Sequence, residues 1–148
     1  MASFTADNAN ITGQVGTPVD NPIKGVKFAK FVYTIVGTEA ATDTITLGTL
    51  PTGATIIPQL SYLTRRSDPG TALTIDIGYS GDADYFADGV VCDAAGTSAF
   101  TTPAVPGQVS APVTFTAPTV LKAVVAAATA LTANAVLEFL VAFTDEEV

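Results

Sequence analysis

The sequence predicts an all-β protein, an antiparallel β-sandwich with an extended N-terminal arm. From residue 27 onward, short runs of β-branched and aromatic residues are separated by Gly, Pro and Asp, which is typical of many-stranded antiparallel proteins. Residues 72–79 alternate strictly between apolar and small or polar side chains, as a strand with one buried face does. Residues 1–26 are rich in Asn, Gly, Thr and Pro and lack such a period. We therefore expect an arm over 1–26 and one sandwich domain over 27–148.

The elements follow from these runs in chain order. Between residues 50 and 53 we expect a turn in which Pro51 sets φ and Gly53 supplies a positive φ. Pro58 cannot donate a ladder hydrogen bond, so we expect a bulge or an edge position there. About eight short strands favour a jelly roll among the sandwiches. The expected strands are residues 27–36, 44–47, 54–64, 72–79, 97–101, 111–116, 119–128 and 135–144.

Two stretches have a mixed pattern. Residues 80–96 are interpreted as a loop, with a short helical turn that Asp82 caps and that Tyr85 and Phe86 pin to the sandwich. Residues 123–140 are rich in Ala and Leu, which favour helix, but their valines favour strand and their central Thr and Asn residues suit a turn. We expect strand, turn and strand over this stretch.

Composition limits the partners. The 148 residues fit one domain, and 48% are hydrophobic while only 14% are charged, which suits a surface made for permanent contacts. The formal net charge of −8 repels phosphate backbones, so we expect no nucleic-acid partner. No signal peptide and no apolar run long enough to cross a bilayer is visible, so we expect no membrane partner. Cys92 is the single cysteine, which excludes an intramolecular disulfide.

The sequence contains few of the residue types that carry out catalysis. The sequence has no His and no Trp, which excludes Ser-His-Asp and Cys-His catalysis and His-based zinc sites. A carboxylate pair is enough for glycoside hydrolysis, but the stacking aromatics of sugar clefts are scarce here. We expect no enzyme activity and no cofactor.

An acidic segment, residues 82–93, is the weak candidate for a metal site. Asp82, Asp84 and Asp88 offer the carboxylate oxygens that Ca²⁺ prefers. Their spacing departs from the EF-hand pattern, because Ala87 stands where Gly is required. Aspartates that form turns are the simpler interpretation, and we favour it.

Interaction residues are expected on the arm, at three lysines that follow one another at a spacing of three (Lys24, Lys27 and Lys30), and at one pair of arginines. The lysines near the end of the arm suit either a solvated strand edge, which we favour, or a patch that docks an acidic partner. Arg65 and Arg66 suit an exposed loop tip, which we also favour, or a docking pair for a partner's carboxylates. The candidate interface residues are Phe4, Ile11, Val15, Val19, Ile23, Lys24, Lys27, Arg65 and Arg66.

The order of three motifs carries a resemblance. FVYTIVG at 31–37, TDTITLGTLPTGATII at 42–57 and LTIDIGYSGDADYF at 73–86 follow one another as they do in small virion proteins of tailed bacteriophages. In that family the segment over 127–145 is a closing hairpin. The chain resembles the family over residues 27–145, and the arm is not matched.

The resemblance implies a jelly-roll head protein, often a decoration or cement protein that binds the outside of the capsid lattice as an oligomer. It implies the major capsid protein and further copies of the chain, as a trimer or dimer, as partners. It also implies a place on the exterior of a virion that assembles in the host cytoplasm. We expect residues 1–26 to reach a neighbouring subunit or the major capsid protein. The alternatives are a minor capsid, head-fibre or tail component, or a carbohydrate- or receptor-binding jelly-roll module.

Overall fold

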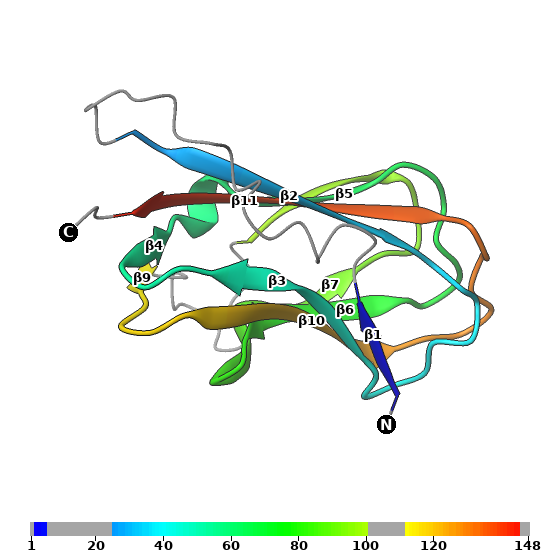
Figure 1. Cartoon of the computed structure of the whole chain (residues 1–148). Coiled ribbons are helices and arrows are strands. Elements are labelled where there is room, and N and C mark those ends of the chain that lie inside the picture. The colour runs from blue at the N-terminus through cyan, green and yellow to red at the C-terminus, as the bar shows by residue number, and fades with distance from the viewer. Residues whose placement is uncertain (1, 6–24, 101–111, 146–148) are drawn as a thin grey trace.

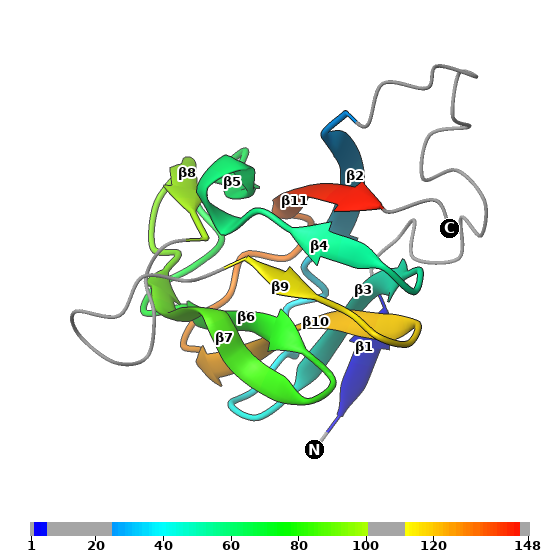
Figure 2. The same ribbon diagram turned by 90° about the vertical axis from the view of Figure 1, so that its left-hand side faces the viewer.

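A computed structural model describes residues 2–5, 25–100 and 112–145. Within these ranges the chain forms eleven strands and a 3-10 helix. The strands make two sheets that face each other as a sandwich (Figure 1, Figure 2). The predicted all-β jelly-roll sandwich is confirmed. The strand number exceeds the expected eight because the structure adds the three-residue strand β1 and the strand β7, and divides one expected strand in two.

Sheet A has the strand order β1-β3-β10-β6-β7. Its strands are β1 (Ser3–Thr5), β3 (Thr44–Leu50), β6 (Thr74–Tyr79), β7 (Asp82–Val91) and β10 (Thr119–Ala127). Neighbouring strands are antiparallel except for β1, which lies parallel to β3. Ser3–Thr5, within the expected arm, therefore pair with the sandwich. Residues 6–24 of the predicted arm lie outside the described residues.

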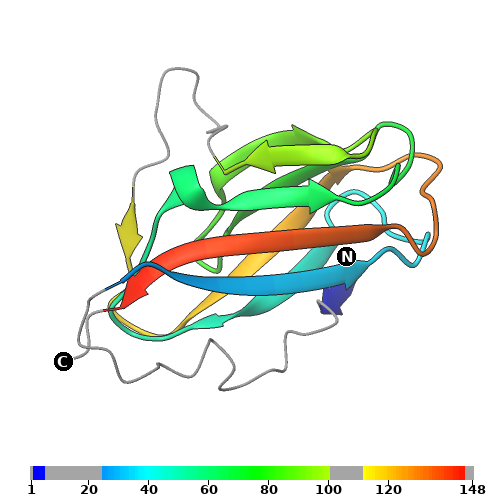
Figure 3. The same ribbon diagram turned by 90° about the horizontal axis from the view of Figure 1, so that it is seen from above.

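Sheet B is built around its longest strand, β11. On one side β11 pairs with β2 along eight residue pairs, and on the other it pairs first with β5 and then with β4 (Figure 3). The outermost strands β8 and β9 pair with β5 and β4. The strands are β2 (Lys27–Thr34), β4 (Ala54–Ile56), β5 (Tyr62–Arg65), β8 (Gly96–Ala99), β9 (Val113–Thr114) and β11 (Val136–Asp145). The strand, turn and strand expected over the Ala-rich stretch are confirmed as β10 and β11.

The continuous strand expected over 54–64 is wrong, because a 3-10 helix, η1 (Pro58–Leu60), separates β4 from β5. The fixed φ of Pro58 suits the start of a helical turn, where its missing N–H is not needed. Ser61 then replaces the missing ladder bonds: its Oγ donates to the carbonyl of Ile57 at 2.9 Å and accepts the N–H of Ala142 at 3.0 Å.

The loop expected over 80–96 is also wrong over most of its length, because residues 82–91 form β7. The β6–β7 register shifts twice, between Ile75 and Ile77 and again between Ile77 and Tyr79. At the first shift Gly89 has φ +63° and its N–H donates to Asp76 Oδ1 at 2.7 Å. Bulges of this kind break the period of two, so the alternation that identifies a strand is lost from the sequence.

The core lies between the two sheets and is filled by the inward residues of both. Phe86, Phe100, Phe139 and Phe143 are its largest fully buried side chains. The sheets approach closely where Phe31 of β2 lies over Gly48 of β3. A Cβ at position 48 would stand 2.6 Å from Phe31 Cε1, so only glycine leaves room for the ring there.

We predict that Gly48→Ala destabilises the fold by about 1–3 kcal/mol, because the added methyl group overpacks the contact with Phe31. Chemical denaturation measures the loss. In the double variant Gly48→Ala/Phe31→Leu the smaller side chain frees the space, so its loss should be less than the sum of the two single losses. Strictly additive losses would contradict the contact.

Candidate interaction surface

The outward side of sheet B exposes apolar side chains. Among the described residues, five large hydrophobic side chains are exposed, and four of them lie in or beside β2 or in η1: Val26, Phe28, Val36 and Leu60. Phe28 is 52% exposed although it lies within a strand. We call the outward residues of β2, β11, β5 and β8 the sheet B outer face. They are Phe28, Lys30, Val32, Thr34, Tyr62, Thr64, Thr97, Val136, Glu138 and Leu140.

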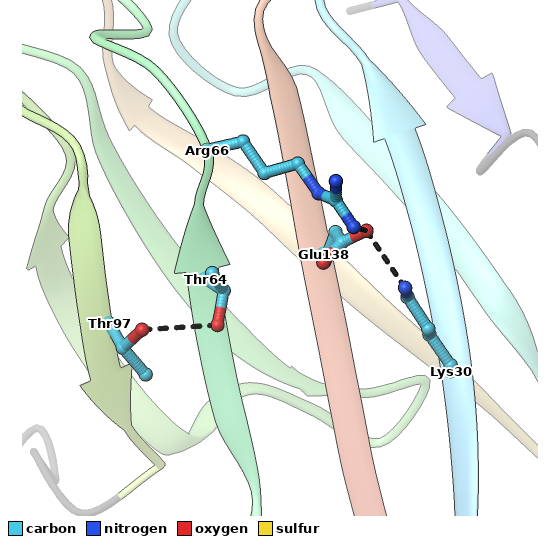
Figure 4. Close-up of polar contacts among 5 residues, drawn as sticks. All are labelled: Lys30, Thr64, Arg66, Thr97 and Glu138. Carbon is cyan, nitrogen blue, oxygen red and sulfur yellow. Dashed lines mark hydrogen bonds and ion pairs between the residues drawn. The ribbon is translucent and has the colours of Figure 1, made fainter.

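An ion-pair cluster occupies the middle of this face (Figure 4). Glu138 Oε1 of β11 lies 2.8 Å from Lys30 Nζ of β2 and 2.7 Å from Arg66 Nη2, just beyond β5. The hydrogen bonds from Arg66 and Lys30 lower the pKa of Glu138, and Glu138 in turn raises the pKa of Arg66. The cluster carries two cations and one anion. It is therefore locally positive on a chain whose net charge is −8.

Paired hydroxyl groups continue the polar centre toward the outermost strands. Thr64 and Thr97 face each other on β5 and β8, with their Oγ1 atoms 3.2 Å apart (Figure 4). Thr64 is also the cross-strand partner of Glu138. The sheet B outer face thus has a short polar row at its centre and apolar residues on both sides, the mixed composition found in many protein interfaces.

The outward side of sheet A is acidic, with Asp76 on β6 and Asp82, Asp84 and Asp88 on β7. Burial raises the pKa of Asp76, and the charges of Asp88 and Asp84 raise it further, against the bond from the Gly89 N–H. The pKa of Asp82 is raised first by a hydrogen bond with Asp84 and then by burial.

The calcium candidates interact with one another and with Asp76. Asp82 interacts with Asp84, and both Asp84 and Asp88 act on Asp76 of the neighbouring strand. Within the described ranges, no group of three or more His, Cys, Asp or Glu side chains could hold a metal ion. The neighbouring carboxylates of these aspartates repel one another, and we assign them no ligand.

Arg65 does not belong to an exposed tip or a docking pair, so the sequence interpretation of this residue is wrong. It occupies an inward position of β5 and is 9% exposed. Its Nε donates to the carbonyl of Ala94 and its Nη1 to Ser98 Oγ, each at 2.9 Å. Nearby, burial raises the pKa of the Cys92 thiol to about 11. Arg66, the next residue, points outward to Glu138.

The other expected interface residues are distributed as follows. Phe4 lies in β1, in register with Ile45, and Lys27 is the first residue of β2. The remaining candidates, Ile11, Val15, Val19, Ile23 and Lys24, lie outside the described residues.

Sequence reasoning missed two groups of residues. Phe28 and Glu138 belong to the sheet B outer face. Their outward direction could have been predicted from the alternation of buried and exposed positions in the two strands that contain them. Glu39 was also missed: it is 7% exposed and accepts hydrogen bonds from Tyr33 Oη at 2.5 Å and from the Val36 N–H at 2.6 Å. These bonds keep its pKa below the ordinary value despite its burial. The carboxylate fixes the turn after β2.

A small cavity lies between the sheets beside Tyr33 and Glu39 and has a volume of about 10 Å³. Such a space has room for about one water molecule at most and is far smaller than a ligand pocket. In the same part of the chain, no helix is long and apolar enough to cross a membrane.

No family model matches the chain, and no curated protein sequence matches it. Solved structures do match. A chain from the capsid of Ralstonia phage GP4 aligns with a TM-score of 0.71 at 21% identity, over 99% of this chain and 100% of that chain. A chain from the cyanophage Pam1 capsid asymmetric unit aligns with a TM-score of 0.61 at 23% identity, over 93% of this chain and 99% of that chain.

A third match is a chain from the acidic stable capsid structure of Helicobacter pylori bacteriophage KHP30, with a TM-score of 0.52 at 17% identity over 80% of this chain and 86% of that chain. At these identities the matches establish the fold. The resemblance to phage virion proteins that the sequence motifs indicated is confirmed at that level.

We predict opposite outcomes for two adjacent arginines. Arg65→Ala should destabilise the protein by about 1–3 kcal/mol, because it opens a cavity and removes the donors to Ala94 and Ser98. Arg66→Ala is the matched control and should cost less than about 1 kcal/mol, because the Arg66 side chain is 61% exposed and Glu138 keeps its pair with Lys30. Thermal and urea unfolding compare the two. Equal losses would mean that Arg65 is not part of the core.

We predict that Asp88→Asn stabilises the protein at pH 7 by about 0.2–1 kcal/mol, because it removes a like charge beside Asp76. Because the folded-state pKa of Asp76 is raised, the folded chain gains stability relative to the unfolded chain as pH falls through that pKa. The advantage of the variant should therefore shrink on acidification and vanish below the ordinary value of 3.8.

Urea unfolding at a series of pH values measures this difference. Asp93→Asn, at an exposed position two residues beyond the end of β7, is the control for net charge. A gain that is equal in both variants, or that does not change with pH, would contradict the pairing of Asp76 with Asp88.

Proposed function

We propose that this chain is a non-enzymatic structural protein of a bacteriophage virion, and specifically a decoration protein that binds the outer capsid lattice and stabilises it. The observation that carries the proposal is the extent of the match to the chain from the Ralstonia phage GP4 capsid. Nearly the whole of this 148-residue chain aligns with the whole of a chain taken from a phage capsid. That chain is therefore also a single small sandwich, a size that suits an accessory component of a shell.

The surface of the sandwich supports the proposal. The sheet B outer face exposes Phe28 beside the Lys30–Glu138–Arg66 cluster, so it combines apolar area with paired charges. A soluble monomer gains nothing from exposing such a phenylalanine, whereas an interface excludes water from it. We propose that this face is covered in the assembled virion.

The mechanism is stabilisation by many simultaneous contacts. We propose that copies of the chain associate as a trimer or dimer and that each oligomer contacts several subunits of the major capsid protein. Residues 1–26 extend the contact to a neighbouring subunit or to the lattice. Because every oligomer is held at several points, individually weak contacts give strong retention on the shell. The chain is assembled in the host cytoplasm and remains on the capsid exterior.

The aromatic side chains favour this role over sugar or receptor binding. A sugar site needs exposed rings that line a concave face. Here Tyr79 packs edge to face against Phe115, with ring centroids 5.3 Å apart, and Tyr85 packs in the same way on Phe86 at 5.1 Å. These rings pack against the core and against one another, so they are not arranged to stack on a sugar. A minor capsid, head-fibre or tail component would use the same sandwich, and the order of assembly separates it from a decoration protein.

We predict that the purified protein binds to capsids that have already assembled without it and raises the temperature at which they rupture. Phe28→Asp should reduce the bound copies per particle by about tenfold or more, because it places an unpaired charge in the covered face. Val91→Asp is the matched control, since Val91 is 55% exposed on β7 of the other sheet. It should bind as the natural chain does.

Quantitative gel densitometry and cryo-electron microscopy of the particles measure occupancy, and unfolding curves verify that both variants are folded. Incorporation only during head assembly, or presence at the tail, would replace the decoration role by that of a minor capsid or tail component. Equal binding by the two variants would remove the sheet B outer face from the proposal.

A further inference from the structure

The strand β1 joins the sandwich in an unusual way. Ser3, Phe4 and Thr5 lie in register with Thr44, Ile45 and Thr46 at the edge of sheet A (Figure 1). This pairing is parallel, whereas every other strand pairing in the described ranges is antiparallel. A parallel neighbour cannot be reached by a tight hairpin, so β1 is docked on β3 from a distance along the chain.

The docking position is formed by main-chain groups and one carboxylate. Asp43 Oδ1 accepts the N–H of Ala2 at 2.7 Å, and the N–H of Thr44 donates to the carbonyl of Ala2 at 3.1 Å. Asp43 is 4% exposed, and its Oδ2 accepts the N–H of Ala40 at 2.9 Å. We call the edge of β3 together with the Asp43 carboxylate the β1 slot. The bond from Ala40 holds the carboxylate in place independently of β1.

The described hydrogen bonds at the β1 slot are generic, because Ala2, the residue before β1, contributes main-chain groups to them. Ala2 and Ser3 are exposed, and only three residue pairs join β1 to β3. The β1 strand of another copy would make every one of these contacts equally well. Exchange of identical elements between copies costs little for this reason.

The segment between β1 and β2 is long enough for β1 to pair with another copy. Residues 6–26, which is 21 residues, separate β1 from β2, and β2 belongs to the other sheet. An extended chain spans at most roughly 3.3–3.6 Å per residue, so this connection is long enough to reach about 70 Å. The sheets of a sandwich lie only about 10 Å apart, and connections within compact domains rarely exceed about 15 residues unless they have a function.

We propose that β1 is exchanged between copies, so that the β1 slot of each sandwich holds the β1 strand of a neighbouring copy. The proposal extends the proposed function, on which it rests for the presence of neighbouring copies. In an oligomer the strands are present at high local concentration, which compensates for the weakness of a three-residue pairing. In a dimer the two copies exchange strands reciprocally, whereas in a trimer each copy gives a strand to one neighbour and receives one from the other, so that the contacts close into a ring.

The test is a disulfide across the slot. Ser3 and Thr44 are Cα partners, and adjacent strands are about 4.8 Å apart, within the range that a disulfide spans. Ser3→Cys/Thr44→Cys is oxidised mildly, both in purified oligomers and on particles, and the products are separated on non-reducing gels. Cys92 is buried and its thiol pKa is about 11, so it does not compete. We expect linked dimers and larger rings, in about tenfold or greater excess over monomers with an internal disulfide.

A second arrangement removes ambiguity about which chain supplies each thiol. A tagged chain carrying Ser3→Cys is produced together with an untagged chain carrying Thr44→Cys. Exchange predicts a disulfide between the tagged and the untagged chain. A reductant should cleave this disulfide and separate the two chains. A disulfide confined to single chains of the double variant, or no disulfide at all, would overturn the exchange.

Binding of the same variants to capsids is measured separately. Linked rings that do not bind capsids would keep the exchange and refute the decoration role. Copies that bind capsids but carry only internal disulfides would keep the decoration role and refute the exchange.

Discussion

Sheet B depends on the hydrogen bonding of β11, because the strands on its two sides pair with it and not with each other. Its inward side chains Leu137, Phe139 and Val141 are almost completely buried, so register errors would remove them from the core. The same register places Glu138 on the outward side, where Lys30 and Arg66 reach it. The packing of the core and the geometry of the sheet B outer face are thus two consequences of one pairing.

The parts of the fold that follow local rules could be predicted from the sequence. Alternation identified β6, and the turn before β4 has the expected positive φ at Gly53, with the Ala54 N–H bonded to the carbonyl of Pro51 at 3.2 Å. The failures occur where distant contacts override the local pattern. β7 contains two bulges and many aspartates, so it reads as a loop. β1 is only three residues long and depends on Asp43, far along the chain.

The candidate surface was predicted less well. Adjacent arginines look alike in a sequence, but Arg65 shares the parity of Leu63, which is buried, and therefore points into the core. This parity is visible only once the limits of β5 are known, and the wrong interpretation of Pro58 concealed them. Phe28 was assigned to a strand correctly. Whether the outward side of a strand meets water or a partner depends on what the chain binds, and the period of the strand does not encode it.

The shape of β7 has a consequence for the solubility of the folded chain. Edge strands with regularly spaced N–H and C=O groups act as templates for further strands and promote fibrils. The two register shifts of β7 interrupt that spacing, and Asp82 and Asp88 add charge on its exposed positions. At the opposite edge of sheet A, β1 covers β3. The β7 edge of sheet A is therefore a poor template for a further strand, which limits aggregation through that edge.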